Sequence, residues 1–599
     1  MRKISAFLGL LFMAAALVAS AVVLPIRIVS STSITADVQA SRTTGVAPLC
    51  VFFDATATVS TAQNTVALAY TNLDYTWTFD DSGAGTWLDT GQGTTLRSKN
   101  YAQGPVAAHC YETAGTYNPV VTVRNSAGET HTDTVQIAVT AAADTASLSG
   151  ANVVCVSTDG VFTGAPASCT QVTTSSLSTA MGNLSSTKKK IVFKCGQSWT
   201  GSYELQLAGP GIIGSWSNGA CGTKPIAVQL NFGDRAIPGT VTDWRVMDMQ
   251  FNGAGAGNGA IGIDGTVSRI AMLRVDIANA GTGINWSEDI LTFYNTNGFP
   301  GHTLPDETYF VDSTITTTAG TSGNNGLYLS SLRVAVMGCT IDPNGGGEHG
   351  LRAPHISRYV IAHNIIQDAA AGKSSLTVRA PPWAGDSLRA ANTYAEKGYI
   401  GHNKLTANAN TYPLDCGPQD TSSVDERSRY VIIDGNWVIG GASTASAIHN
   451  RCNNTTIRNN VIDLTLGGMG IELLEYGAGS PTDPSVMEVY NNTIYSGSSG
   501  GFTGLSKDAN VSSVTVRNNL GYAPSSSSRS MTNGSMTESN NSSDAQILIN
   551  PNFTGTTTPA DFDPNSASYP IDGGITVEVM RDHQGALRTG TYDIGAVNP

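Results

Sequence analysis

Charge is scarce in this chain of 599 residues, and the charge that is present leans acidic. Only 13% of the residues are charged, and 33 basic against 46 acidic residues give a formal net charge of −13. A nucleic-acid-binding protein needs a surplus of Lys and Arg to meet the phosphates. The balance therefore argues against nucleic acid as a partner, and an acidic ligand would require a local cluster of cations.

Helix-forming residues are also few compared with turn and strand formers. The chain has 65 Gly together with abundant Ser, Thr and Asn, a composition typical of all-β proteins with many turns. The chain is also too long for one ordinary core. Several domains or a repeat architecture are therefore expected.

Long apolar runs are absent except at the N-terminus. Met1-Arg2-Lys3 precedes an apolar run from Ala6 to Pro25. Residues 1–21, which end in a small-residue cleavage site, are predicted to be a secretory signal peptide. The alternative is an uncleaved membrane anchor, for which the run is barely long enough. We therefore expect a secreted or cell-surface protein that touches a membrane only through this segment, if the segment is uncleaved.

The nine Cys residues form no C-x-x-C pair and no Cys/His cluster of the kind that binds zinc. In an exported protein they indicate disulfides plus one unpaired thiol. Proximity in the sequence predicts the pairs Cys50–Cys110, Cys155–Cys169, Cys195–Cys221 and Cys416–Cys452. Cys339 is then the free thiol, expected to be buried.

Residues 34–141 alternate apolar and polar residues over short runs separated by turns, which is the pattern of a β-sandwich. Segments 47–55, 77–83 (centred on Trp77-Thr78-Phe79) and 114–117 resemble a PKD domain, an immunoglobulin-like module. The resemblance implies a spacer or a carbohydrate-contacting domain that is not catalytic. A linker of small residues follows at 141–147.

A repeat begins after this linker, in which short apolar runs end in a similar residue. The closing residues are Ser313, Cys339, Asn364, Asn403, Asn436, Asn460, Asn492 and Asn519, at spacings of 24 to 39 residues. Such a period with loop insertions indicates a solenoid, and strand-like period-2 patterns inside each repeat favour a parallel β-helix. Each Asn is expected to stack on the next at a bend.

This part of the chain resembles the right-handed parallel β-helix of the pectate-lyase-like superfamily, through an entry segment at 191–214 and a closing segment at 571–596. The predicted fold is all-β: an immunoglobulin-like (PKD) β-sandwich over 34–141, a right-handed parallel β-helix over 148–545, and a C-terminal closing segment over 546–599. Residues 523–545 are expected to be a loose surface loop. The resemblance implies the fold and leaves the reaction open, because lyases, hydrolases, epimerases and binding proteins share it.

Ionisable residues gather on one stretch of the β-helix, 346–380. Aligning the inward apolar residues of successive coils predicts one outward column across neighbouring coils, about 4.8 Å apart. The column is Tyr328, Arg352, Thr377, Asp415, His449 and Glu472, with Arg379 and Arg451 at the next outward position and Glu348, His349 and Lys373 nearby. Scarce charge concentrated in this way predicts a site, although such residues could also be structural ladder pairs.

Cleavage of a uronate by β-elimination needs a cation for the C5 carboxylate, a base for the C5 proton and an acid for the leaving oxygen. Arg352 and Arg379 suit the carboxylate, and Lys373, His449 or His349 could act as the base. Other substrate contacts are expected from Tyr328, Asp415, Glu472, Arg451 and Trp383, where Trp383 either stacks on a sugar ring or packs inside its loop.

The stretch from Lys373 to Arg379 is similar to the chondroitinase B and alginate lyase family. That resemblance implies a Lys base, an Arg acid and a calcium ion held by carboxylates. Among the residues here, Glu348 alone corresponds to such a ligand.

Two other functions stay open beside this secreted lyase of an acidic polysaccharide. A glycoside hydrolase would use Asp415 and Glu472 as its two carboxylates, two coils or about 10 Å apart. A non-catalytic glycan-binding or surface structural protein would bind through the same column and turn nothing over.

Overall fold

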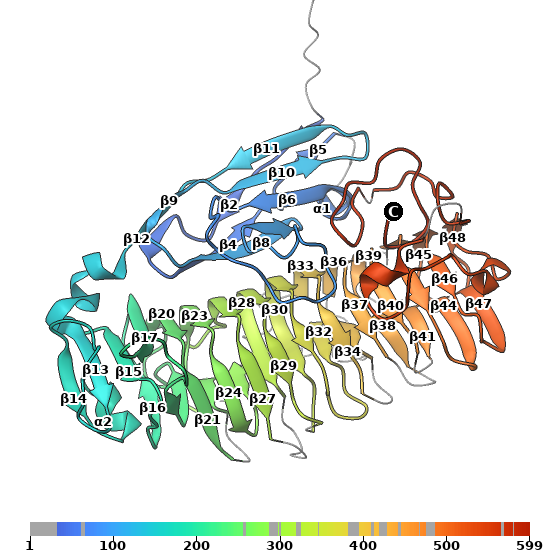
Figure 1. Ribbon diagram of the computed structural model, residues 1–599. Coiled ribbons are helices and arrows are strands. Elements are labelled where there is room, and N and C mark those ends of the chain that lie inside the picture. The colour runs from blue at the N-terminus through green and yellow to red at the C-terminus, as the bar shows by residue number, and fades with distance from the viewer. Residues whose placement is uncertain are drawn as a thin grey trace, which may run out of the picture.

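The protein is seen in a computed structural model as a small β-sandwich lying along the side of a long stack of β coils (Figure 1). The structure describes residues 33–61, 66–255, 259–286, 297–298, 301–318, 325–345, 347–380, 395–408, 412–418, 428–440, 445–465, 468–474, 486–564, 568–578 and 580–598. The predicted signal peptide lies outside these residues.

The N-terminal sandwich is built from short, mostly antiparallel strands. One sheet has the order β11-β10-β6-β7, and the others are β2-β4-β8, β3-β12-β9 and β1-β5. Phe53 of β4 packs against Trp77 of β6, with ring centroids 5.7 Å apart, in the core between sheets. The bounds are β1 Ile34–Thr35, β2 Gln39–Ala40, β3 Thr44–Val46, β4 Leu49–Asp54, β5 Val59–Ser60, α1 Val66–Asn72, β6 Asp74–Thr78, β7 Tyr101–Gln103, β8 Val106–Tyr111, β9 Gly115–Tyr117, β10 Val120–Arg124, β11 Thr130–Thr134 and β12 Ile137–Thr140.

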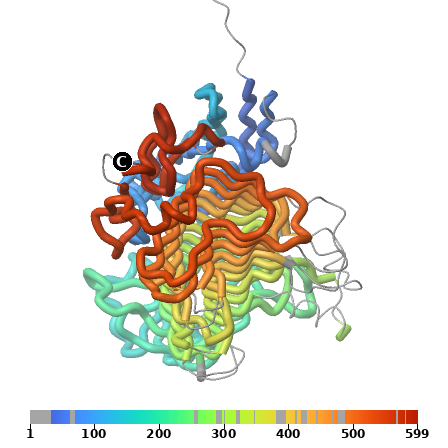
Figure 2. Tube along the Cα trace, turned by 90° about the vertical axis from the view of Figure 1, so that its right-hand side faces the viewer, coloured from blue at the N-terminus to red at the C-terminus, as the bar shows by residue number. Residues whose placement is uncertain are grey.

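The rest of the chain winds into a stack of coils (Figure 2). The pairing of its strands makes it a parallel β-helix with three ladders. The first ladder is β16 Ser202–Leu205, β19 Gln229–Phe232, β22 Ile261–Ile263, β25 Ile284–Trp286, β28 Leu327–Met337, β30 Leu351–Ala362, β32 Leu376–Ala380, β35 Leu414–Pro418, β38 Ser446–Asn450, β41 Met469–Leu473, β44 Gly501–Lys507 and β47 Ser528–Asn533. The long strands β28 and β30 continue around a corner and also belong to the second ladder.

The second ladder is β13 Val153–Ser157, β15 Lys190–Lys194, β17 Gly211–Trp216, β20 Val241–Met247, β23 Val267–Leu273, β26 Asp306–Val311, the ends of β28 and β30, β33 Ala395–Gly401, β36 Ser428–Asp434, β39 Asn453–Arg458, β42 Val486–Tyr490, β45 Ser513–Arg517 and β48 Thr537–Ser539. Strand β14 Thr170–Thr173 pairs with β13.

The third ladder is β18 Ile226–Ala227, β21 Gln250–Gly255, β24 Asp276–Ala280, β27 Thr314–Thr317, β29 Thr340–Asp342, β31 Ile365–Ile366, β34 Lys404–Thr406, β37 Trp437–Ile439, β40 Val461–Asp463, β43 Thr493–Tyr495 and β46 Leu520–Tyr522. The short helices are α2 Leu177–Met181, η1 Ala142–Asp144, η2 Ala146–Leu148, η3 Gly150–Asn152, η4 Gln546–Leu548 and η5 Pro559–Phe562.

Aliphatic side chains stack inside the coils and fix the register of the strands. Leu327, Leu351, Leu376 and Leu414 pair in sequence on adjacent strands and are fully buried. A slip of one residue would turn this row toward solvent. The row therefore determines which residues of the first ladder point outward.

An asparagine ladder runs along the bend between the second and third ladders. In each step the side-chain Nδ2 of one Asn donates to Oδ1 of the next, at 2.9–3.0 Å, and the same Oδ1 accepts a backbone N–H. The rungs are Asn364, Asn403, Asn436, Asn460, Asn492, Asn519 and Asn541. The predicted stacking is confirmed, and Asn541 adds a rung that the sequence repeat did not reveal.

Removing one buried rung should destabilise the β-helix. In Asn436→Ala, the backbone N–H and the Nδ2 of Asn403 lose their shared acceptor, and unsatisfied buried donors cost about 1–3 kcal/mol each. We expect the free energy of unfolding, measured in urea, to fall by about 3 kcal/mol. The exposed Asn510→Ala should change it by less than about 0.5 kcal/mol. Equal effects of the two substitutions would contradict a structural role for the ladder.

The prediction of a loose loop over 523–545 is wrong. Strands β47 and β48 lie in this segment and add another coil to the first and second ladders. The segment is rich in Ser and Thr because this last coil is mostly exposed and buries few apolar groups, among them Met531. Ile547 in η4 then covers the end of the core.

All four predicted disulfides are present, and Cys339 is a free buried thiol, as predicted. Disulfides of this number are typical of proteins from oxidising compartments. Within the described part of the chain, no helix is both long and apolar enough to cross a membrane.

The sandwich packs directly on the second ladder. Strands β4 and β8 contact β26, β28, β30 and β33, and α1 contacts β36 and β39. Phe52 and Val360 belong to one buried cluster that joins the two parts. The buried guanidinium of Arg245 donates to the carbonyls of Val46 and Pro48 at 2.9 and 2.7 Å. The sandwich is therefore not held away from the β-helix as a spacer would be.

The C-terminal segment fastens the sandwich to the β-helix from outside. Arg581 pairs with Asp74 of the sandwich at 3.0 Å. On the β-helix side, the side-chain Nδ2 of Asn491 donates to the carbonyl of Asp593 at 2.9 Å, and the N–H of Ala596 donates to Thr493 at 2.9 Å. The C-terminal segment therefore links the sandwich to the β-helix in addition to closing one end of the coil stack.

Three histidines are buried where these parts meet. His363 and His402 occupy left-handed turn positions (φ 60° and 56°). The ring of Trp87 stacks on His363, which stacks on His402, with centroids 5.3 Å apart in both cases. Burial lowers the pKa of His363, His402 and His583, that of His402 to about 4.

Stability should therefore fall on mild acidification. An unfolded His protonates below its ordinary pKa of 6.5, whereas His402 resists protonation down to about pH 4 in the fold. The stabilisation is complete above pH 6.5 and is lost as the pH falls toward 4, with His402 accounting for about 2 kcal/mol between pH 7 and pH 5. Urea unfolding of His402→Asn should show a smaller pH-dependent loss than the wild type. The exposed Asn510→Ala should show the full loss, and an undiminished loss in His402→Asn would contradict a stabilising role for the neutral imidazole.

Candidate functional site

The predicted outward column lies in register on the first ladder. Adjacent strands pair residues in the order Tyr328, Arg352, Thr377, Asp415, His449 and Glu472. The next outward row is less regular, because a register shift in β28 and β30 places Ser330 opposite His355, one residue further along β30 than the pairing of Tyr328 with Arg352 would give. The alternation of inward Leu and outward polar residues is enough to align the main column.

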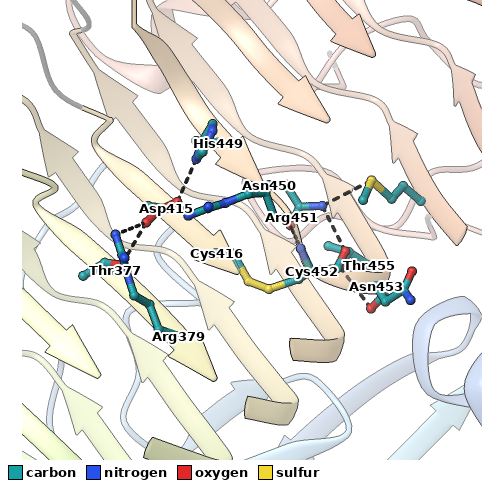
Figure 3. Close-up of a disulfide and its surroundings, with 11 residues drawn as sticks. Thr377, Arg379, Asp415, Cys416, His449, Asn450, Arg451, Cys452, Asn453 and Thr455 are labelled. Carbon is teal, nitrogen blue, oxygen red and sulfur yellow. Dashed lines mark hydrogen bonds and ion pairs between the residues drawn. A yellow bond between two sulfur atoms is a disulfide. The ribbon is translucent and has the colours of Figure 1, made fainter. Parts of the chain in front are cut away.

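Asp415 is the hub of this column (Figure 3). Its Oδ2 accepts from Arg379 Nη2 at 2.8 Å and Thr377 Oγ1 at 3.1 Å, and its Oδ1 accepts from His449 Nδ1 at 2.8 Å and Arg451 Nη2 at 3.3 Å. Burial by itself would raise the pKa of Asp415. The hydrogen bond from His449 and the charges of Arg379 and Arg451 outweigh burial and hold this pKa well below its usual range. Asp415 is therefore an ionised acceptor and cannot serve as a proton donor near neutral pH.

A disulfide holds the two strands of this hub together. Cys416 follows Asp415 on β35, Cys452 follows Arg451 after β38, and their buried sulfurs are bonded (Figure 3). This covalent link lies on the inward side of the strands and fixes the positions of the neighbouring outward residues, Asp415 and Arg451. The site is thus built on rigid strands, which favours precise geometry.

His449 is oriented by Asp415. A carboxylate can only accept, so the proton of the neutral imidazole is on Nδ1 and the lone pair is on Nε2. Glu472 Oε2 lies 3.9 Å from that Nε2 and accepts from Ser446 Oγ at 3.0 Å. An imidazole held in one tautomer by a carboxylate is suited to act as a general base.

Tyr412 completes this group, and the sequence did not reveal it. Its ring stacks on His449, with centroids 4.2 Å apart. Burial and the charges of Glu472 and Asp415 raise the pKa of Tyr412, so its hydroxyl keeps its proton. Tyr412 precedes β35 and stands outside the repeating column. The one feature of the sequence that could have indicated its place beside His449 is its position two residues before the inward Leu414, which is a weak signal.

Two of the three candidate bases are already engaged. Lys373 Nζ lies 2.9 and 2.8 Å from the two carboxylate oxygens of Glu348. His349 Nδ1 accepts the backbone N–H of Ser374 at 2.9 Å, and burial together with the charges of Arg379 and Arg352 lowers the pKa of His349 to about 3. Lys373 Nζ and His349 Nδ1 are therefore not arranged to take a proton from a substrate.

Arg352 lies at one end of the column, with its guanidinium 5.1 Å from the centroid of the Tyr328 ring. Among the residues that the structure describes, no carboxylate forms an ion pair with it. Arg379 differs, because its charge is matched by Asp415. Arg352 is therefore the better candidate for an acidic ligand.

Two predicted features stay without a structural account. Trp383 lies outside the described residues. In the described ranges, no group of three or more His, Cys, Asp or Glu residues could hold a metal ion, and the carboxylate of Glu348 contacts Lys373.

Comparison with known proteins identifies the sandwich. Residues 35–138 match the PKD domain family, which confirms the resemblance noted in the sequence. No curated protein matches the chain.

Among solved structures, the chain is similar to pectate lyase Pel9A at 13% identity (TM-score 0.30, covering 74% of this chain and 96% of that chain). It is similar to a Yersinia enterocolitica family 28 exopolygalacturonase at 9% identity (TM-score 0.36, 85% and 98%) and to the A-module of the Azotobacter vinelandii mannuronan C-5 epimerase AlgE6 at 11% (TM-score 0.30, 61% and 94%). With TM-scores this low, the assignment of the fold rests on the strand pairing described above.

In their neutral forms, the imidazoles of His449 and His349 should be opposite tautomers. His449 should carry its proton on Nδ1, which donates to Asp415, and His349 on Nε2, because its Nδ1 accepts. Nitrogen-15 NMR of histidine-labelled protein at pH 7 distinguishes the two, with assignments from His449→Gln and His349→Gln. A His449 protonated on Nε2 would rule out the orientation that we assign to Asp415.

Proposed function

We propose that this protein is an exported enzyme that cleaves an acidic, uronate-containing polysaccharide by β-elimination, with His449 as the base. The observation that supports this most is the arrangement around Asp415. It combines an imidazole that is oriented by a carboxylate with two guanidinium groups, Arg379 and Arg451, within hydrogen-bonding distance of the same carboxylate.

The cations meet the substrate charges. Each guanidinium has five N–H donors, of which Asp415 uses few. In the proposal, Arg451 and Arg379 direct others to the C5 carboxylate of the reacting sugar and so stabilise the charge that develops when C5 loses its proton. Arg352 is three strands from His449, about 14 Å along the stack. It would bind the carboxylate of another sugar in a polymer that follows the column.

The proton transfers use His449 and Tyr412. The Nε2 of His449 takes the C5 proton, and the electron pair of the C5–H bond forms the C4–C5 double bond while the C4–O bond breaks. The leaving oxygen receives the hydroxyl proton of Tyr412. The products are a new chain end and a 4,5-unsaturated uronate, and return of the proton from His449 to Tyr412 through water restores the enzyme.

Hydrolysis with paired carboxylates receives less support. An inverting or retaining hydrolase needs one carboxyl group that is protonated at the start of the reaction. Asp415 is held ionised, so it cannot be that acid. Its side chain is buried and both of its oxygens accept hydrogen bonds from Arg379, Thr377, His449 and Arg451, so it is also poorly placed to be the second carboxylate that attacks the sugar or activates water.

The proposal predicts ultraviolet absorbance from unsaturated uronate when the protein is incubated with alginate, pectate or chondroitin, in parallel with neutral glycans. His449→Ala should lower kcat by about 10²–10⁴-fold, and Arg352→Ala should raise KM more than it lowers kcat, because Arg352 lies away from the reacting bond. Lys373→Ala should change either constant by less than about threefold, since Lys373 is paired with Glu348.

His131→Ala, in the sandwich, is the matched control for the histidine substitution. Each assay is run with calcium and with a chelator, so that loss of activity in the chelator would reveal a metal requirement. New reducing ends without absorbance would favour a hydrolase. Binding without either product would favour a glycan-binding or structural protein.

A further inference from the structure

A cleft opens between the sandwich and the β-helix, away from the column. It has a volume of about 390 Å³, within the range of small-molecule sites. Gln39 and Ser41, in and beside β2, line one wall, and Ser357 lies on the other, where β30 turns from the first ladder to the second. Neither part forms this cleft without the other.

The charges that line the cleft are matched in pairs. Arg358 Nε lies 2.5 Å from Asp54 Oδ2, across the boundary between the two parts. Arg333 uses Nε and Nη2 to contact both carboxylate oxygens of Asp306. These side chains are 22–32% exposed, so their other polar atoms can reach a ligand.

Matched pairs of this kind select against charged ligands. With one carboxylate for each guanidinium, the cleft has no surplus charge to attract an anion or a cation. The column differs, because there two guanidinium groups share Asp415. An uncharged ligand with several hydroxyl groups can use the remaining N–H donors and carboxylate lone pairs together. The hydroxyl of Ser41 also has a proton to donate, since its oxygen accepts the backbone N–H of Phe52 at 3.1 Å.

We propose that this cleft is a second carbohydrate site, which binds a neutral saccharide. This inference rests on the proposed function only for the chemical class of the ligand, a carbohydrate. That the carbohydrate is uncharged follows from the pairing of the charges in the cleft. Ser357 follows Arg352 by five residues on the same strand, which turns a corner between the two ladders, so the two residues are at most about 17 Å apart. An uncharged branch of a polymer that lies on the column, or a separate neutral glycan, could therefore occupy the cleft. The site also gives the docked sandwich a part in binding.

Calorimetric titration of the full chain tests this inference with defined probes. These are cello-, xylo-, manno- and galacto-tetraose as neutral ligands and tetragalacturonate as the acidic one. At least one neutral tetrasaccharide should bind. Ser357→Trp, which fills the cleft, should weaken that binding more than about tenfold, and Gln39→Ala should weaken it about three- to tenfold through loss of a hydrogen bond. The exposed Ser185→Trp, far from the cleft, is the matched control and should bind as the wild type does.

The possible outcomes separate this inference from the proposed function. No binding of any neutral probe, or binding that Ser357→Trp leaves unchanged, would overturn it. Binding of tetragalacturonate alone, lost in Ser357→Trp, would overturn the neutral class. If Ser357→Trp does not fold, as judged by its thermal unfolding, Gln39→Ala decides alone. Neutral binding in a protein without β-elimination activity would overturn the proposed function and leave the cleft intact.

Discussion

The register of the stacked coils is the constraint on which the rest of this structure depends. Two interactions maintain it: the buried row that includes Leu351 and Leu376, and the asparagine ladder at the bend. The apolar row is non-directional and would tolerate small shifts. The asparagines are directional, because each amide must meet the next one at hydrogen-bonding distance. Together they fix the position of every outward side chain on the first ladder.

Because the coils are stacked in register, residues that are distant in the sequence lie side by side in one site. Asp415 and His449 are 34 positions apart in the sequence, yet they face each other because β35 and β38 pair in parallel. The buried carboxylate then determines the chemistry available to its neighbours. It keeps two guanidinium groups close and orients His449. Because it is ionised, buried and hydrogen-bonded through both oxygens, it is available neither as an acid nor as a carboxylate that attacks the sugar. This is why the same column supports elimination better than hydrolysis.

The sequence was informative wherever structure follows from local spacing. Disulfides between near neighbours, the repeating asparagines and the column from Tyr328 to Glu472 all obey a short period, which a single sequence displays. The docked sandwich leaves no such signal: Arg358 contacts Asp54 over 304 positions, and Arg581 contacts Asp74 over 507. The role of Tyr412 depends on how the chain enters β35, and the engagement of Lys373 and His349 depends on partners that only the fold brings near. The coil at 523–545 was missed because an exposed end coil needs few apolar residues.

The sandwich and the C-terminal segment also change how the molecule is understood as a whole. A PKD domain attached by a linker would move independently, whereas here the buried Arg245 and the stacked rings of Trp87 and His363 join it to the β-helix. The sandwich thereby covers the second ladder from β26 to β39, and the first ladder is left to carry the column. The same docking creates the cleft between the two parts.

The most direct test of the central claim is a crystal structure of a His449→Gln variant with an acidic oligosaccharide bound. We expect a chain along the column, with one carboxylate on Arg451 or Arg379, another toward Arg352, and C5 of one sugar facing the side chain at position 449. An oligosaccharide bound elsewhere, or one with its C5 hydrogen turned away from this position, would contradict it.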